Sequence, residues 1–194
     1  MIVRLFAAFL LAMSALLPVA EGQTHVAEPK VVSIDPVIAD KRLAINADID
    51  FPLNEQLRDA VERGVPLYFT ADIKISRSRW WWFDREIADA STTWKVSYNA
   101  LTRQWRVGQG DLSLNVGSLD EAMGVVRHIR DWRVADGDEF EAGTVYHGQL
   151  RVRLDTSLLA RPFQVNALNS SAWTPATPWR EFSFTLTEPA RDPS

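Results

Sequence analysis

The chain has 194 residues, a formal net charge of −4 at pH 7 and no cysteine. The lack of cysteine excludes a disulfide framework, a lipid-modified N-terminal cysteine and thiolate catalysis. The mildly acidic charge without a basic tail argues against nucleic acid as a partner, and the length suits one domain.

The first 22 residues have the anatomy of a signal peptide. A basic start, an apolar run and a small-x-small motif follow in this order: Arg4, Leu5 to Leu17, Ala20 and Gly22. The run is shorter than the roughly 20 residues that a membrane-spanning helix needs. We therefore predict cleavage before Gln23, a periplasmic or secreted location and no integral membrane domain after cleavage. The alternative is an uncleaved N-terminus that tethers the protein to the membrane.

A flexible leader is expected over residues 23–30, followed by two strands. Val31 to Ile38 is rich in β-branched residues but contains Pro36, which suits an edge strand. From Leu43 to Phe51, apolar and polar residues alternate, which predicts a strand with one wet face that carries Asp48 and Asp50.

A short helix and a long strand come next. Asn54 can cap the helix, Gly64 can end it, and the apolar residues between them recur at helical spacing: Leu57, Ala60 and Val61. Alternation then resumes from Val65 to Ile75, with the odd positions facing inward.

The stretch Arg77-Ser78-Arg79-Trp80-Trp81-Trp82-Phe83 interrupts this alternation. If the odd positions stayed inward, Arg77 and Arg79 would be buried without partners, which is costly. We therefore expect the strand to stop, bend or bulge near residues 76–79. Neighbouring side chains on a strand point to opposite faces, so at least one large ring is left for solvent, a covering loop or a partner.

Strand patterns dominate the rest of the chain. We predict strands over residues 93–98, 104–107, 112–116, 145–155 and 181–187, a four-residue turn at 99–102, a helix over 118–132, a turn at 136–138 and irregular structure over 162–178. The helix begins with a capping box of Ser118 and Glu121, and its apolar stripe runs to Trp132. Short connections favour antiparallel pairing. The expected fold is mainly β: an antiparallel two-sheet sandwich over residues 31–188 with two short connecting helices, and a disordered tail at 189–194.

We find no catalytic or metal-binding motif in the chain. The three histidines His25, His128 and His147 lack metal-ligand spacing, and G-x-S-x-G is absent. Clustered carboxylates could hold Ca²⁺, but a solvated turn is favoured: Asp136, Asp138, Glu139 and Glu141. We expect no cofactor, no metal and no enzymatic activity. The alternative is an envelope hydrolase that uses a carboxylate such as Asp48 or Asp50, or His147.

Arginine combined with tryptophan is the remaining signal. The predicted binding residues are Arg77, Arg79, Trp80, Trp81, Trp82 and Arg85. Guanidinium groups stack on tryptophan rings, and tryptophan is enriched at binding hot spots. The functional interpretation is a recognition surface for a peptide, glycan or lipid headgroup. The structural interpretation is an internal latch, in which Arg79 or Arg85 pairs with Asp84 or Glu86 and covers a ring.

Four stretches resemble one known family, the proteobacterial domain-of-unknown-function family 4390. They are Gly64 to Phe69, Arg77 to Trp82, Tyr98 to Val107, and a C-terminal stretch with Leu154-Asp155, Pro162 to Leu168 and Trp173. The resemblance extends from about Val31 to Leu186. This sequence departs from the family pattern at Trp81, at Leu159-Ala160 and at Phe182, and the changes keep the aromatic character of the segment. The resemblance implies an exported envelope protein with no established activity, cofactor or catalytic residue. It also implies a link to a membrane sensor kinase of the nitrogen-regulation type. Together with the missing catalytic motif, this favours a non-enzymatic binding or interaction module of the cell envelope whose oligomeric state is open.

Overall fold

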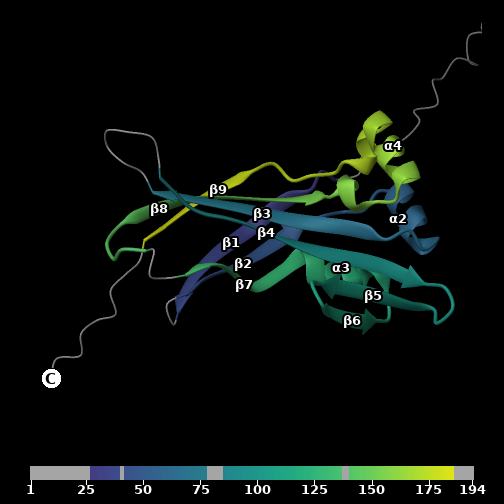
Figure 1. The fold of residues 1–194 in the computed structure, drawn as a ribbon, viewed down its shortest axis with the longest axis horizontal. Coiled ribbons are helices and arrows are strands. Elements are labelled where there is room, and N and C mark those ends of the chain that lie inside the picture. Colours follow the sequence, from purple (N-terminus) through teal and green to yellow (C-terminus); the bar gives the residue numbers. More distant parts are fainter. Residues whose placement is uncertain (1–26, 40–41, 78–84, 137–139, 186–194) are drawn as a thin grey trace, which may run out of the picture.

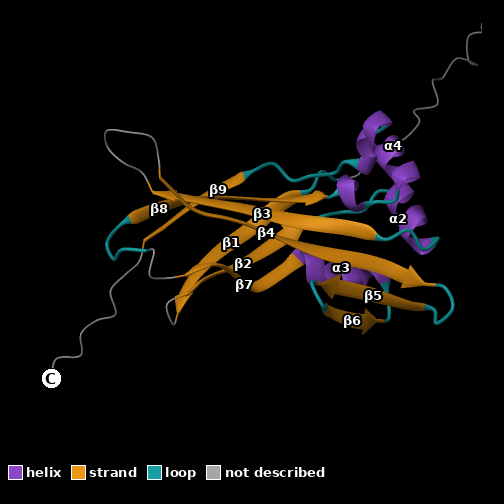
Figure 2. Ribbon diagram, in the orientation of Figure 1, coloured by secondary structure: helices purple, strands orange, loops and turns teal. Residues whose placement is uncertain are grey.

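The computed structural model describes residues 27–39, 42–77, 85–136 and 140–185. Its strands form two antiparallel sheets, which confirms the predicted mainly β, two-sheet architecture (Figures 1 and 2). A six-stranded sheet has the order β6-β5-β4-β3-β8-β9, and a three-stranded sheet has the order β1-β2-β7. The elements within the described ranges are β1 (Lys30–Ala39), β2 (Arg42–Asp50), α2 (Glu55–Glu62), β3 (Leu67–Arg77), β4 (Arg85–Asn99), β5 (Gln104–Gln109), β6 (Leu112–Val116), α3 (Leu119–Arg127), β7 (His128–Asp136), β8 (Val145–Leu154), the 3₁₀ turn η3 (Thr156–Leu158), α4 (Arg161–Asn169), the 3₁₀ turn η4 (Ser171–Trp173) and β9 (Arg180–Thr185).

The three-stranded sheet follows the alternation read from the sequence. Its central strand β2 buries the predicted apolar side chains Leu43, Ile45, Ala47 and Ile49. Pro36 lies in the edge strand β1 opposite Ile45. This position suits a residue that has no N–H to donate, so the predicted edge strand is confirmed.

The six-stranded sheet is built around β3. Its odd positions from Leu67 to Ile75 are buried, and the strand pairs with β4 on one side and β8 on the other. The predicted β4–β5 hairpin is present, and the side chain of Asn99 accepts hydrogen bonds from the N–H groups of Leu101 and Thr102 in the turn.

A single hydrophobic core lies between the inner faces of the two sheets. Phe51, after β2, meets Phe69 of β3 edge-to-face at 5.4 Å between ring centroids. Helix α2 closes this core at one end, and Figure 2 shows α2 and α4 together there, opposite the end at which β3 stops and β4 starts. Helices α2 and α4 therefore lie at the end of the large sheet opposite Arg77, and the candidate site lies at the Arg77 end.

The prediction of a second helix over residues 118–132 is wrong after Arg127. Helix α3 begins at its predicted cap, Ser118, but ends at Arg127, and the next residues form β7. Ile129 pairs with Ala47 and Trp132 with Ile45, so β7 carries one extra residue there, and Asp131 has a positive φ of 50°. A bulge of this kind lets residues three apart share one face. Such a spacing cannot be told from helical periodicity in the sequence.

The stretch predicted to be irregular contains helix α4. Pro162 lies in its first turn, where a missing N–H breaks no hydrogen bond within the helix. The ring of Phe163 stacks on Trp173 of η4 at 5.6 Å. Proline here starts the helix instead of preventing one, which is why the composition was misleading.

The predicted signal peptide, residues 1–22, and the predicted tail, residues 189–194, lie outside the described residues, as does most of the predicted leader. The predicted turn at 136–138 is described only at Asp136. Within the described ranges, no helix combines the length and apolarity that crossing a bilayer requires.

Candidate functional site

The predicted site lies where β3 ends and β4 begins. Arg77 and Arg85 are paired across the two strands and form the base of the connection between them. The four other predicted binding residues are outside the described residues: Arg79, Trp80, Trp81 and Trp82. The structure therefore describes the two strand ends, at Arg77 and Arg85, between which the tryptophan stretch lies in the sequence. We call these two strand ends the base.

A bulge does occur near residue 76, but it lies on β4, and the inward phase of β3 that was expected to fail at Arg77 continues to that residue. Ile75 pairs with Ala88 and Ser76 with Glu86, so Ile87 is the extra residue. Strand β3 stays in unbroken register with β8 as far as Arg77 opposite Tyr146. The bulge therefore shifts the register of β4 relative to β3 by one residue next to the candidate site.

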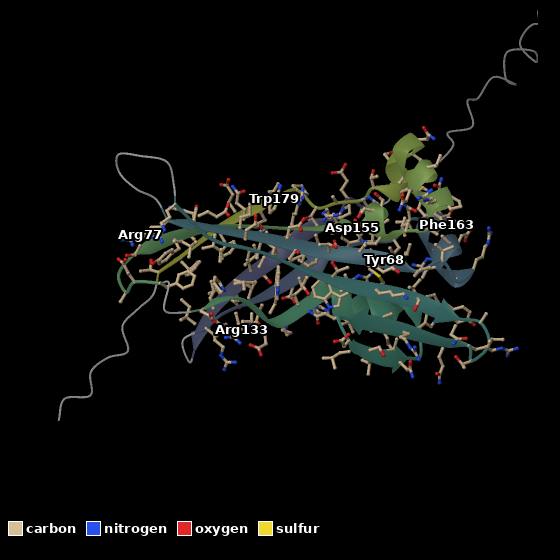
Figure 3. All side chains as sticks on the ribbon, in the orientation of Figure 1. Tyr68, Arg77, Arg133, Asp155, Phe163 and Trp179 are labelled. Carbon is tan, nitrogen blue, oxygen red and sulfur yellow. The ribbon has the colours of Figure 1, made fainter. Side chains whose placement is uncertain are left out.

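The prediction that an inward Arg77 would lack a partner is wrong. Arg77 keeps the inward phase of β3, but its guanidinium lies 2.7 Å from a carboxylate oxygen of Glu141, and its side chain is 32% exposed (Figure 3). The backbone N–H of Glu141 donates to the hydroxyl of buried Tyr146 at 2.7 Å, which holds the carboxylate in place. Glu141 comes from the segment before β8, so no local sequence signal linked it to Arg77.

Electrostatics keep this pair ionised. The hydrogen bond from Arg77, supported by its charge and that of Arg85, lowers the pKa of Glu141. The same hydrogen bond raises the pKa of Arg77 above its ordinary value. The latch predicted from the sequence stays a prediction, because Arg79, Asp84 and the tryptophan rings lie outside the described residues; the ion pair at the base joins Arg77 to Glu141 instead.

An aromatic cluster supports the base from inside. Tyr146 contacts Phe140 edge-to-face at 4.9 Å and stacks on Phe184 at 5.5 Å, and Phe182 stacks on Phe184 at 6.1 Å. Phe182 and Phe184 belong to β9, which pairs with β8 beside them. These rings fix the strands that present the candidate site.

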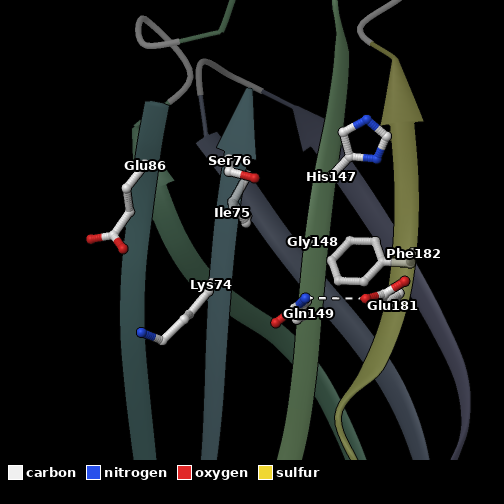
Figure 4. Close-up of a pocket in the computed structure, with 9 residues that line it drawn as sticks. All are labelled: Lys74, Ile75, Ser76, Glu86, His147, Gly148, Gln149, Glu181 and Phe182. Carbon is white, nitrogen blue, oxygen red and sulfur yellow. Dashed lines mark hydrogen bonds between the residues drawn. The ribbon is translucent and has the colours of Figure 1, made fainter. Parts of the chain in front are cut away.

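A shallow depression of about 540 Å³ opens beside this base (Figure 4). Its lining comes from β3, β4, β8 and β9: Lys74, Ile75, Ser76, Glu86, His147, Gly148, Gln149, Glu181 and Phe182. We call it the outer-face depression, because its polar side chains lie on the face of the large sheet that is turned away from the core. Gln149 donates to Glu181 at 3.2 Å across β8 and β9. The depression carries both signs of charge, since Lys74 lies among Glu86 and Glu181.

Arginine and tryptophan do meet in the structure, at a place that the sequence did not indicate. The guanidinium of Arg151 lies 4.5 Å from the ring of Trp179. The Nε atoms of Arg151 and Arg153 both donate to Asp72 at 3.0 Å. Trp105, flanked by Arg103 and Arg106 in the sequence, is instead buried with its ring 4.9 Å from that of Tyr98. The Arg151–Trp179 contact therefore fastens the segment before β9 to the sheet.

The residues of the hydrolase alternative lie apart. Asp48 is on β2 of the three-stranded sheet, whereas His147 is on β8 of the six-stranded sheet. Asp48 is 2.9 Å from His128, and it accepts from Arg130 at 2.5 Å and from Ser33 at 2.9 Å. Asp50 lies 3.7 Å from Lys30. The residue that sequence reasoning missed is His128, which was placed on a helix and is the first residue of β7.

These contacts indicate that Asp48 has a structural role, because three side chains hold its carboxylate. Hydrogen bonds from His128, Arg130 and Ser33, in that order of effect, lower the pKa of Asp48 well below its ordinary range. A general base works best with a pKa near the operating pH. Ser33 donates to the carboxylate and not to the histidine, so the three groups lack the nucleophile–base–orienter order of a triad. Among the residues that the structure describes, no group of three or more His, Asp or Glu side chains is arranged to hold a metal ion.

Comparison with known proteins gives one match. The model of the family described as "domain of unknown function (DUF4390)" matches residues 27–183. No curated protein and no solved structure matches the chain. The match extends over both sheets and includes the base of the β3–β4 connection and the outer-face depression. The chain therefore belongs to the DUF4390 family.

Proposed function

We propose that this protein is a non-enzymatic binding module of the cell envelope that recognises a partner protein at the Arg77 end of its large sheet. One observation carries the proposal. The Arg77–Glu141 ion pair fixes the base of a connection that contains three consecutive tryptophans, directly beside the outer-face depression.

The arrangement favours a protein partner over a simple anion. Lys74 is paired with Asp89 at 3.4 Å, and two further carboxylates, Glu86 and Glu181, line the depression. A surface with both signs of charge suits a peptide segment that carries both, whereas an isolated phosphate or carboxylate would be repelled by the glutamates. Tryptophan is enriched among interface hot spots, and interface rims are usually polar, so the tryptophan stretch in the sequence and the polar depression both suit a protein partner.

Location and partner rest on other grounds. Export to the periplasm rests on the signal-peptide pattern of residues 1–22. The partner that we propose is the membrane sensor kinase implied by the resemblance to the family. The mass of the intact protein tests cleavage and export. A mass that matches a chain beginning at Gln23 supports them, and a mass that matches a chain beginning at Met1 contradicts them.

The binding test combines site variants with matched controls. Purified wild-type protein and a W80A/W81A/W82A variant are compared for capture of envelope proteins and for affinity to the isolated periplasmic domain of the sensor kinase. We expect an affinity loss of about tenfold or more, the effect of one to two hot-spot residues. Trp179→Ala is the matched control, because it removes a tryptophan that contacts Arg151 on the outer face of the same sheet.

A second pair of variants separates the depression from the tryptophans. Glu86→Lys changes a charge in the outer-face depression, and Glu55→Lys makes the same change on α2, at the opposite end of the sheets. We expect only Glu86→Lys to weaken capture. Unchanged capture by the tryptophan variant and by Glu86→Lys, with the melting temperature preserved, refutes the proposal. Turnover of an ester, peptide or glycan substrate that Asp48→Asn or His147→Ala abolishes would replace it with the hydrolase alternative.

A further inference from the structure

Strand β6 is an unprotected edge of the large sheet. It pairs only with β5 in the sheet order, and it lies at the rim of the sheet in Figure 1. An edge strand presents unpaired backbone N–H and C=O groups, and proteins usually guard such edges with charges, prolines or bulges. Whether β6 is guarded can be read from its residues.

The other edge strands in the described part of the chain carry these guards. Strand β1 has Pro36 and an irregular register. Strand β7 has Arg130 and Arg133 and its own bulges, and β9 has Arg180 and Glu181. Strand β6 reads Leu-Ser-Leu-Asn-Val, has no charge and no proline, and keeps an unbroken register with β5.

The side chains of β6 point to association as well. Leu112 is 79% exposed and Leu114 is 56% exposed. The two leucines border a small hollow of about 230 Å³ whose other apolar walls are Trp94, Val107 and Val125. This face of β6 therefore leaves apolar surface in water beside an open strand edge.

We propose that β6 pairs antiparallel with β6 of a second copy of this chain, so that the two large sheets become one continuous sheet across a two-fold axis at Leu114. Such a two-fold contact uses the same patch on both copies and must be self-complementary. In this register Leu114 meets Leu114, Leu112 meets Val116, and Ser113 meets Asn115.

Within the strand the register brings no charged side chains together, because β6 has none. The nearest charged residue before the strand, Asp111, falls opposite Gly117 of the second copy, whose N–H donates to the carboxylate of Glu121 at 2.9 Å. The two carboxylates repel each other at each end of the pairing, so the dimer should strengthen as the salt concentration rises. Arg106 is already hydrogen-bonded to Asn115 at 3.1 Å on its own sheet. The strand offers no charge that would select a different protein, whereas its apolar and polar positions match those of its own copy. Five residues a side is a small interface, so the dimer should be reversible and depend on concentration.

Sedimentation velocity over roughly two decades of protein concentration tests the proposal. The wild-type protein should shift from monomer to dimer. Leu114→Lys places two ammonium groups at the two-fold axis and should stay monomeric with an unchanged melting temperature, because Leu114 is largely exposed. The matched control is Leu101→Lys, the same change at a leucine that is 96% exposed in the β4–β5 turn, and it should dimerise like the wild type.

A cross-link gives an independent readout. The chain has no cysteine, so a disulfide in Leu114→Cys can only join two copies. Residues directly opposite in an antiparallel pair have Cβ atoms about 4.5–5.5 Å apart, close to what a disulfide requires. Under mild oxidation we expect Leu114→Cys to form a covalent dimer many times faster than Leu101→Cys.

Three results would overturn self-pairing: a monomer at every concentration, a dimer that Leu114→Lys leaves intact, or equal cross-linking of the two cysteine variants. A monomer whose capture of another envelope protein is lost in Leu114→Lys would assign the edge to a different partner. The tryptophan variants should dimerise normally, so this test and that of the proposed function can fail separately.

Discussion

Replacing Gly148 by alanine tests how closely β9 packs against β8 on the core side of the large sheet. Gly148 is on β8, directly opposite Phe182 of β9. A Cβ atom at this position would lie 2.2 Å from Cζ and 2.4 Å from Cε1 of the Phe182 ring. Ordinary van der Waals contact begins near 3.4 Å, so the ring would have to retreat by about 1.2 Å, the difference between 3.4 and 2.2 Å.

The size of the effect follows from how freely that ring can move. Adding a methyl group to a packed site costs about 1–3 kcal/mol. Two effects reduce this cost: alanine in a strand gains about 0.5–1 kcal/mol over glycine, and Phe182 is only half-buried. The ring is also stacked on Phe184, which transmits part of the shift to Tyr146. We expect a net loss of about 1–2 kcal/mol, or a melting temperature lower by roughly 2–8 °C.

Chemical and thermal denaturation of three variants give the answer. Gly148→Ala should be destabilised, and the double variant G148A/F182L should recover most of the loss, because leucine lacks the ring atoms that clash. Gly124→Ala is the control: a Cβ atom there meets nothing within 4 Å, and the residue lies in helix α3. It should gain about 0.5–1 kcal/mol from helix propensity. If Gly148→Ala is as stable as the wild type, or if Phe182→Leu fails to rescue it, the ring does not cover Gly148.

Three further predictions concern single contacts. Ser118→Ala removes the cap that accepts from the N–H of Glu121 at 3.1 Å and should cost about 0.5–2 kcal/mol in a denaturant titration; no loss would mean that the cap is dispensable. Tyr146→Phe removes the acceptor of the Glu141 N–H and should cost about 0.5–1.5 kcal/mol, and an unchanged unfolding midpoint would contradict it. The pKa of Asp48 is lowered from its ordinary value of 3.8 by His128, Arg130 and Ser33, so its stabilisation is present above that pH and is lost as the pH falls below it. The melting temperature of Asp48→Asn should therefore fall less steeply than that of the wild type below about pH 4; parallel curves would exclude this contribution.

Local patterns in the sequence predicted the elements whose contacts are also local. The alternation from Leu43 to Phe51 and from Val65 to Ile75 predicted β2 and β3 and which of their faces is buried. Asn54 and Ser118 cap their helices as predicted, because a cap depends on a side chain and an N–H three residues on. Where a bulge changed the periodicity, as in β7, the same method failed and gave a helix.

The candidate site was only partly predictable for the same reason. Its position at the end of β3 was predicted from an arginine at an inward position of the alternating pattern, a local feature, although Arg77 keeps that inward phase in the structure. The partner of Arg77 was not predicted, because Glu141 reaches it from the segment before β8. Likewise, the pairing of Asp48 with His128 depends on the β2–β7 register.

By itself, the sequence determined the mainly β class, most strand positions and the helix caps. These properties depend on which face of an element each side chain occupies, and that is decided within a few residues. Only the tertiary structure decided the order of the strands, the ion pair at the base of the tryptophan connection, the outer-face depression and the open edge at β6. Each of these joins residues that are far apart in the chain, and the packing of the whole core brings them together.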